Sequence, residues 1–309
     1  MKKFFVAILV SVLVFAGFAE ESADEMYRRG CELDTSDALE FINRSATMGH
    51  PEAQLLIGSI FYQRSVDEFG YNRYSDSAYW LEKAALNGIT QAQTYLGMMY
   101  HDGTGVERNY DKALSFLLSA ATKNHPEALN YLGLIYFNGQ GVEQKYSEAL
   151  YWFEASANQN DFEYPYESNF LKKFCKNFST RYIVNSQFWA GYIYYFGQGV
   201  DINYEKALSY LFSAAKAGES SAQYLVCYAY FNGQGIEKNA SKAFEWAKKS
   251  AGQGNPEGQY TLGLMYENGT GTIKSKSKAI SWYEKAASQG NTQAKERLEA
   301  LNLTKKKSK

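Results

Sequence analysis

A short glycine-containing string returns at regular intervals along the chain and constrains its fold more than any other feature. The copies read HDGTGV, NGQGV, FGQGV, NGQGI and NGTGT, and their first glycines are Gly103, Gly139, Gly197, Gly233 and Gly269. Three of the intervals are 36 residues long and one is 58. A fixed period of this length is typical of a repeat array in which each unit packs only on its neighbours. The chain is therefore predicted to be a solenoid, which weakens any expectation of an active site.

Each copy of the repeat carries two further patterns, and each of them predicts a helix. A small residue is followed three positions later by an aromatic residue and eight positions later by an alanine, as in Ala149, Trp152 and Ala157. These offsets lie on one face of an α-helix. Before each turn, another register holds a small residue with an aromatic residue three positions later; its members are Gly58, Gly97, Gly133, Gly191, Cys227 and Gly263. Because glycine costs a helix interior about 1 kcal/mol relative to alanine, this register predicts close approach of a neighbouring helix.

Residues that start or stop helices mark the boundaries of the unit. Pro51, Pro126 and Pro256 stand where the first helix of a unit begins, a position that tolerates proline. The glycines of the turn supply the left-handed conformation that ends this first helix. The second helix is predicted to be capped by a side-chain oxygen at its N-terminus; the candidates are Asn109, Asn203, Asn239 and Ser275. Each unit is therefore predicted to read helix, turn, helix, turn.

The pattern AxxxxxLGxxYxxGxGVxxxYxKAxxWxxxAAxxG resembles the Sel-1-like repeat, a relative of the tetratricopeptide repeat with units near 36 residues. The resemblance covers residues 36–301, and its clearest copy is 128–160. It implies an all-α fold, an α/α superhelical solenoid of about six full helix-turn-helix repeats with half repeats at the ends. We expect a lone second helix near 37–48 and a lone first helix near 292–301, giving about fourteen helices.

Two places break the period. The first full repeat has three extra residues around 65–74, and the fourth has 22 extra residues at 161–182. In the longer insertion, Phe170, Phe174 and Phe178 recur at helical spacing, which predicts a short amphipathic helix. Its apolar stripe either packs back on the solenoid or forms a docking element. Both interpretations stay open, because a regular scaffold tolerates functional insertions on its surface.

The two ends of the chain carry different signals. Lys2 and Lys3 precede an apolar run at 4–15, and small residues lead up to Ala19, so 1–19 resembles a secretory signal that is cleaved to leave a mature chain starting at Glu20. Residues 20–35 are expected to form a leader, and the basic segment 302–309 a disordered tail. The apolar run is shorter than the roughly 20 residues that span a bilayer. We therefore expect a secreted or periplasmic protein without stable membrane insertion.

The sequence predicts no catalytic residue, no metal ligand and no cofactor site. A cysteine-rich branch of the same family is linked to penicillin binding or hydrolysis, but this chain has only Cys31, Cys175 and Cys227, which permits at most one bridge such as Cys175 to Cys227. Ser213 and Lys216 match the SxxK string of penicillin-binding enzymes, yet they fall at variable repeat positions and no KTG accompanies them.

The histidines do not indicate a catalytic or metal site, and the overall charge does not indicate a nucleic-acid site. His50, His101 and His125 are scattered, and the two that precede a proline are expected to cap helices. The mature chain has a formal charge near −3, which disfavours nucleic acid as a partner.

Surface recognition is the function that remains. The first helices of a solenoid typically line its concave side, and their variable positions include Tyr95, Tyr131, Trp189 and Leu225. Tyrosine and tryptophan give large contact areas with few rotatable bonds, which suits peptide binding. A second register lies next to the first and contains Thr94, Asn130, Phe188, Tyr224 and Tyr260. One of the two registers must face the partner helix and belong to the core.

The sequence thus predicts a non-catalytic scaffold or adaptor that binds an unidentified protein or peptide in the bacterial envelope or outside the cell. A penicillin-interacting enzyme and a secreted effector that binds a host protein remain as alternatives.

Overall fold

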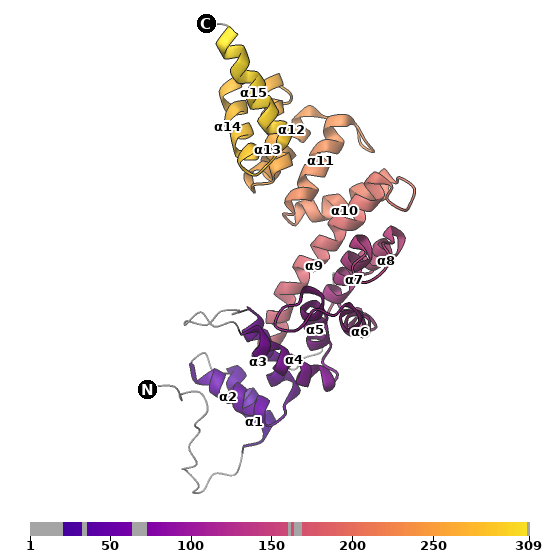
Figure 1. Cartoon of the computed structure of the whole chain (residues 1–309), viewed down its shortest axis with the longest axis vertical. Coiled ribbons are helices and arrows are strands. Elements are labelled where there is room, and N and C mark those ends of the chain that lie inside the picture. The colour runs from indigo at the N-terminus through magenta and orange to yellow at the C-terminus, as the bar shows by residue number, and fades with distance from the viewer. Residues whose placement is uncertain (1–20, 33–35, 64–72, 160–161, 164–168, 308–309) are drawn as a thin grey trace.

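The computed structural model describes residues 21–32, 36–63, 73–159, 162–163 and 169–307. Secondary structure in these ranges is entirely α-helical, and Figure 1 shows the helices stacked along one long axis with α1 and α15 at opposite ends. The helices are α1 (Ala23–Glu32), α2 (Ser36–Thr47), α3 (Pro51–Gln63), α4 (Tyr74–Leu86), α5 (Thr90–Asp102), α6 (Tyr110–Ala121), α7 (Pro126–Asn138), α8 (Tyr146–Ala157), α9 (Asn169–Phe196), α10 (Tyr204–Lys216), α11 (Ser220–Asn232), α12 (Ala240–Gly252), α13 (Pro256–Asn268), α14 (Lys276–Ser288) and α15 (Thr292–Lys307). The predicted all-α solenoid is confirmed.

The odd-numbered helices from α3 to α13 are the first helices of the repeats, and each packs against the even-numbered helix that follows it. Successive first helices also contact one another, as α5 with α7, α7 with α9 and α11 with α13. Two helices that are separated by one other helix in the chain make close contacts mainly where both are first helices. The array therefore curves with its first helices on the inner side.

None of the described helices combines the length and the apolar character needed to cross a membrane.

The helix boundaries follow the predicted signals. Proline begins α3, α7 and α13, and a glycine in the left-handed region ends each first helix that precedes a glycine turn, with φ of 68° at Gly139. The side chain of Asn109 accepts a hydrogen bond from the backbone N–H of Lys112 at 2.9 Å. Equivalent caps are made by Asn203, Asn239 and Ser275. The predicted caps are therefore confirmed.

The glycines inside the first helices lie where the partner helix approaches most closely. A Cβ atom built on Gly133 would stand 2.5 Å from the ring of Phe153, and one on Gly97 would stand 2.6 Å from Leu117. The same relation holds at Gly58, Gly191 and Gly263. Each glycine thus makes room for a large side chain of the second helix. The predicted close approach is confirmed.

In the fifth repeat the larger of the two side chains lies on the first helix and the smaller on the second, the reverse of the other repeats. Here Cys227 replaces the glycine, and the position held elsewhere by Leu81, Leu117, Phe153, Leu211 or Tyr283 is Ala247. Both residues are fully buried, and the Cys227 sulfur lies against the backbone of Ala247. The extra volume on the first helix compensates for the volume missing from the second.

The second glycine of each turn joins one repeat to the previous one. A Cβ atom on Gly105 would stand 2.5 Å from the backbone of Tyr74, and one on Gly199 would stand 2.8 Å from the Cβ atom of Tyr146. These tyrosines begin the second helix of the preceding repeat. The two glycines of the GxG string therefore serve different purposes: the first ends a helix, and the second admits the neighbouring repeat.

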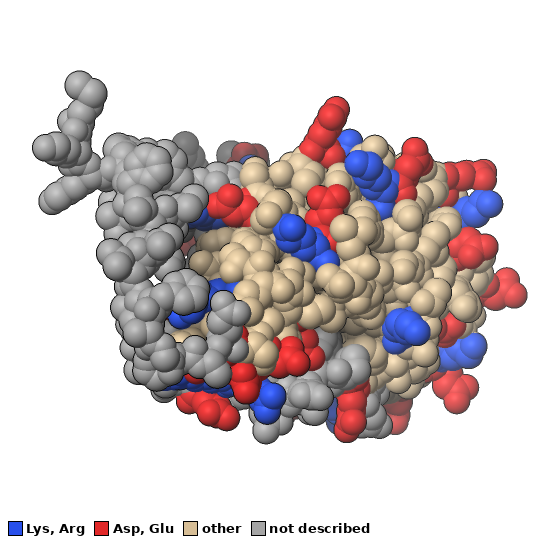
Figure 2. All heavy atoms as spheres, turned by 90° about the horizontal axis from the view of Figure 1, so that it is seen from below, with Lys and Arg blue, Asp and Glu red and all other residues tan. Residues whose placement is uncertain are grey.

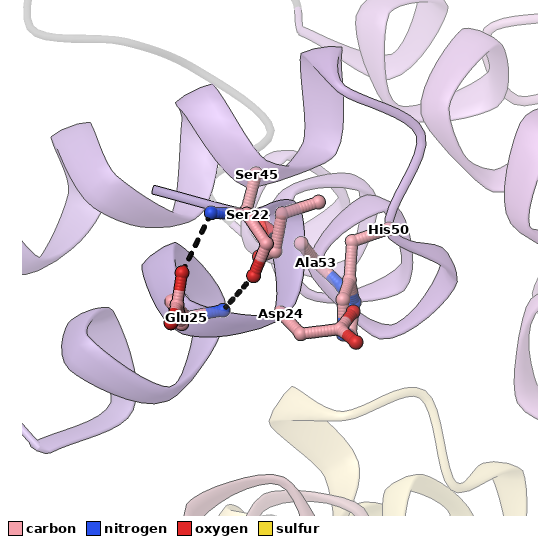
Figure 3. A network of polar contacts seen from close by, with 7 residues as sticks. Ser22, Asp24, Glu25, Ser45, His50 and Ala53 are labelled. Atoms are coloured by element: carbon pink, nitrogen blue, oxygen red, sulfur yellow. Dashed lines mark hydrogen bonds and ion pairs between the residues drawn. The ribbon is translucent and has the colours of Figure 1, made fainter. Parts of the chain in front are cut away.

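The first described hairpin differs from the prediction. The predicted lone second helix is wrong, because α2 pairs with α1, which lies within the expected leader. Ser22 and Glu25 cap α1 reciprocally, with Ser22 N donating to Glu25 Oε2 at 2.8 Å and Glu25 N donating to Ser22 Oγ at 3.2 Å (Figure 3). Ser45 Oγ of α2 donates to the carbonyl oxygen of Ala23 at 2.6 Å. The array thus begins with a complete helix pair.

The other end and the insertion also depart from the prediction. Helix α15 continues to Lys307, so most of the expected disordered tail is helical. Helix α9 is 28 residues long and runs through the second half of the insertion into the first helix of the fourth repeat. The predicted separate short helix is wrong, because no proline or glycine stands between Phe170 and Gly191 to end it. Residues 1–20, with the predicted signal, lie outside the described residues.

Candidate interaction surface

The four residues predicted to meet a partner are mostly used by the fold. Tyr95 is 2% exposed and Leu225 is 5% exposed, so these two offer almost no side-chain surface, and their prediction as partner-binding residues is not carried further. Tyr95 stacks on Tyr62 with ring centroids 5.3 Å apart. Trp189 and Tyr131 are half-buried, and the indole of Trp189 lies 4.6 Å from the ring of Phe137. For these two residues, partner binding stays a prediction.

The adjacent register divides along the chain. Thr94 and Asn130 are buried, whereas Phe188, Tyr224 and Tyr260 are half-buried. Asn130 Nδ2 donates to Asn185 Oδ1 at 2.9 Å and to Ser186 Oγ at 2.7 Å, which fixes α9 on α7. In the N-terminal half this register is therefore core, and only in the C-terminal half does it reach the surface.

Two exposed aromatic side chains lie farther along the same helices, Tyr228 one turn beyond Tyr224 and Phe196 two turns beyond Phe188. On α9, Tyr192 and Phe196 follow Phe188 at intervals of four, and the rings of Tyr192 and Phe196 are 4.7 Å apart. On α11, Tyr228 follows Tyr224 with ring centroids 6.2 Å apart. Phe196 is 45% exposed and Tyr228 is 39% exposed. We refer to Phe188, Tyr192, Phe196, Tyr224, Tyr228 and Tyr260 as the aromatic face.

Burial raises the pKa of two tyrosines on α9 and α11. Burial is the main cause that raises the pKa of Tyr195 of α9, with smaller contributions from Tyr204, Tyr228 and Tyr224. Burial also raises the pKa of Tyr224 to about 12, with smaller contributions from Tyr228, Glu257 and Tyr260. Tyr195 and Tyr224 are therefore neutral hydrogen-bonding groups at physiological pH.

A buried polar cluster joins α5 to α7 beside Phe162. His125 Nδ1 lies 2.9 Å from Glu127 Oε2, and His125 Nε2 lies 2.9 Å from Gln91 Oε1. Thr94 Oγ1 is 3.1 Å from His125 Nδ1. The expected capping role of His125 is wrong, because its side chain makes no cap bond to α7. For His50 it is confirmed, since His50 Nδ1 accepts from the backbone N–H of Ala53 at 3.2 Å.

Both described ends of the insertion pack back on the array. The ring of Phe162 meets His125 edge to face at 5.5 Å, and Tyr182 lies 6.0 Å from Tyr131. Burial raises the pKa of Tyr182 to about 12. The side chains of Phe170, Phe174 and Phe178 lie outside the described residues, so their docking role stays a prediction.

The reactive side chains take up ordinary structural positions. Cys227 is a free thiol, so it does not form the permitted bridge to Cys175, and burial raises its pKa to about 12. Ser213 Oγ donates to the carbonyl oxygen of Ser209 in its own helix at 3.1 Å. Within the described ranges, no group of three or more His, Cys, Asp or Glu side chains is placed to hold a metal ion.

Comparison with known protein families finds the Sel1 repeat six times, at residues 51–89, 90–125, 126–161, 184–219, 220–255 and 256–291. The chain belongs to the Sel1 repeat family. The matched units begin at first helices, as at Pro51, Thr90 and Pro126, and the fourth begins inside α9, just past the insertion. Helices α1, α2 and α15 lie outside the matched repeats and form the ends of the Sel1 array.

Solved structures show the same fold. A Sel1 repeat protein from Oxalobacter formigenes aligns with a TM-score of 0.61 at 26% sequence identity, covering 85% of this chain and 92% of that one. A protective antigen with this type of repeat fold, present in uropathogenic Escherichia coli strains, aligns with a TM-score of 0.50 at 29% identity. That alignment covers 92% of this chain and 65% of the antigen. No curated protein matches the chain.

Proposed function

We propose that this Sel1 repeat protein is a secreted or periplasmic scaffold that binds a protein or peptide partner through the aromatic face. The observation that carries the proposal is the exposure of Phe196 and Tyr228 on the inner, first-helix side of the array. Aromatic side chains cost little conformational entropy to immobilise and dominate the energetics of many protein interfaces.

The aromatic face differs from the aromatic residues of the second helices. Trp246 and Trp282 occur in the repeat pattern, and each is covered by a lysine, with Lys249 Nζ 4.1 Å and Lys285 Nζ 4.0 Å from the ring centroid. Among the described residues, no lysine or arginine stacks on Phe196 or Tyr228. Their side chains are therefore available to a partner, and their removal is expected to leave the fold intact.

Affinity capture from envelope and culture fractions tests the proposal. The purified chain is compared with the double variant Phe196→Ala/Tyr228→Ala and with Tyr151→Ala, a matched control. Tyr151 is 61% exposed but lies on the second helix α8. We expect a partner that the unaltered chain and the control retain and the double variant loses. Equal retention by all three proteins would refute a role for the aromatic face.

The proposed location rests on Lys2, Lys3 and the apolar run that follows them. Cell fractionation combined with mass spectrometry of the purified protein tests it. We expect a mature chain beginning at Glu20 outside the cytoplasmic membrane. A chain that retains residues 1–19 and stays in the cytoplasm would contradict this part of the proposal, without bearing on the aromatic face.

A further inference from the structure

The small net charge of the protein conceals a strong separation of charge along the array. Residues 20–163 contain 22 Asp and Glu against 10 Lys and Arg, a formal charge of −12. Residues 164–309 contain 11 Asp and Glu against 20 Lys and Arg, a formal charge of +9. The N-terminal half is therefore acidic and the C-terminal half basic.

The separation is sharpest at the two ends. Residues 20–48 carry 8 acidic and 3 basic side chains, whereas residues 240–309 carry 6 acidic and 13 basic ones. These segments lie at opposite ends of the array (Figure 1). Figure 2, which views the molecule from below Figure 1, shows Asp and Glu side chains interspersed with Lys and Arg on the described part of that face. Since salt screens exposed charges beyond about 8–10 Å, the two ends cannot neutralise each other within one chain.

Exposed lysines on α12 and α14 form the best-defined part of the basic half. We define the basic face as Lys242, Lys248, Lys249, Lys276, Lys278 and Lys285, all of which are exposed. Lys249 and Lys285 rest on the indoles of Trp246 and Trp282, which holds these ammonium groups in place. No ion pair joins any of the six lysines to a carboxylate in the described ranges.

The acidic half offers matching side chains. Glu40, Glu82 and Glu107 are exposed, and none of them forms an ion pair with a described cation. A polyanion attracted to the basic face would be repelled by this half of the same chain. Only a partner with the same polarity in reverse satisfies both halves, and a second copy placed antiparallel to the first has that polarity.

We propose that the protein pairs with a second copy of itself, with the basic face of each copy against the acidic N-terminal half of the other. The pairing is self-complementary: each of the two contacts repeats the other, as in a twofold-symmetric dimer. It is electrostatic, so it weakens as salt screens the charges. It does not depend on the partner of the aromatic face and goes beyond the function proposed above.

Sedimentation velocity of the purified chain tests the pairing. We expect dimers at low ionic strength, about 0.02 M, and monomers at about 0.5 M, where the screening length falls to a few ångströms. The variant Lys248→Glu/Lys249→Glu/Lys276→Glu/Lys285→Glu should be monomeric at both salt concentrations. The control Lys83→Glu/Lys112→Glu reverses two lysines of the acidic half in the same repeat registers as Lys285 and Lys278 and should still pair.

A charge-exchange experiment identifies the matching surface. The variant Glu40→Lys/Glu82→Lys/Glu107→Lys should be monomeric alone but should pair when mixed with the four-lysine variant. Circular dichroism and the thermal midpoint check that each variant is folded, and the salt titration of the unaltered chain needs no variant at all. A monomeric unaltered chain at low salt would overturn the proposal, as would unchanged pairing of the four-lysine variant. Retention of a monomeric chain by anionic vesicles or nucleic acid would overturn it in favour of an anionic partner.

Discussion

The exchange of side-chain size between Cys227 and Ala247 leads to a double-mutant prediction. In the five other repeats the first helix has glycine at this position and the second helix has leucine, phenylalanine or tyrosine. If the two positions share one packed volume, replacing either residue alone by its counterpart in the other repeats should destabilise the array. Replacing both should restore the arrangement used elsewhere.

The size of each effect follows from burial. Cys227→Gly removes a fully buried side chain and introduces a helical glycine, a cost of about 2 kcal/mol in the free energy of unfolding. Ala247→Leu forces extra carbon atoms against the Cys227 sulfur and costs about 2 kcal/mol. Independent effects would add to about 4 kcal/mol. We expect the double variant to lose only about 1 kcal/mol, the helical cost of glycine, so the coupling energy is about 3 kcal/mol.

Urea denaturation followed by circular dichroism measures this coupling, with the denaturant slopes compared so that any loss of cooperativity is recognised. Cys227→Gly combined with Asn109→Ala serves as the control, because effects at distant sites add to within about 0.5 kcal/mol. Additive effects of Cys227→Gly and Ala247→Leu would refute the claim that the two side chains share one volume.

Three further predictions concern stability. Gly133→Leu should lower the free energy of unfolding by about 1–3 kcal/mol through overpacking against Phe153; an unchanged thermal midpoint would contradict the close approach of α7 and α8. Asn203→Ala removes the cap bond to Lys206 N at 3.0 Å and should cost about 1 kcal/mol, whereas Asn203→Ser should recover most of it; equal midpoints for the two variants would argue against capping. Arg297 lowers the pKa of Glu267 through hydrogen bonds of 2.6 and 2.9 Å. Because the folded pKa is depressed, this contribution is present above the ordinary value of about 4.5 and is lost as pH falls through the lowered pKa. Stability measured between neutral and acid pH should therefore fall less in Glu267→Gln than in the unaltered chain; identical pH profiles would show that the pair contributes nothing.

Features that repeat along the chain were predictable because local chemistry fixes them. The left-handed glycines, the asparagine caps and the prolines at helix starts each act within a few residues of their own position. The buried glycines were also predictable, since an unfavourable residue held in one register needs a packing reason. Repetition made each of these signals stronger than a single occurrence.

The missed features depend on residues that are distant in sequence or on patterns that have lost the repeat consensus. His125 was expected to cap a helix, but its partners Thr94 and Gln91 precede it by 31 and 34 residues. No glycine turn follows helix α1, so the repeat pattern did not indicate this helix. The signal that remained for it in the sequence was the capping pair Ser22 and Glu25. That pattern, a serine followed three residues later by a glutamate, was readable in the sequence.

Three members of the aromatic face, Tyr192, Phe196 and Tyr228, were missed for a different reason. Two adjacent helical registers both carried aromatic residues, and the rotation of each helix against its neighbours depends on tertiary packing that neither register specifies. The structure buries Tyr95 and Leu225 and exposes Tyr228, one turn beyond Leu225, and Phe196, two turns beyond Trp189. The spacing of four between Phe188, Tyr192 and Phe196, repeated in Tyr224 and Tyr228, was the signal available.

The central claim is that the first-helix side of this Sel1 array recognises a partner. Calorimetric titration of a captured partner with the Tyr228→Ala and Tyr151→Ala variants tests this claim most directly. We predict that Tyr228→Ala weakens binding by about tenfold, which corresponds to a loss of about 1.4 kcal/mol, while Tyr151→Ala binds like the unaltered chain. Equal affinities for the two variants, or a loss confined to Tyr151→Ala, would contradict it.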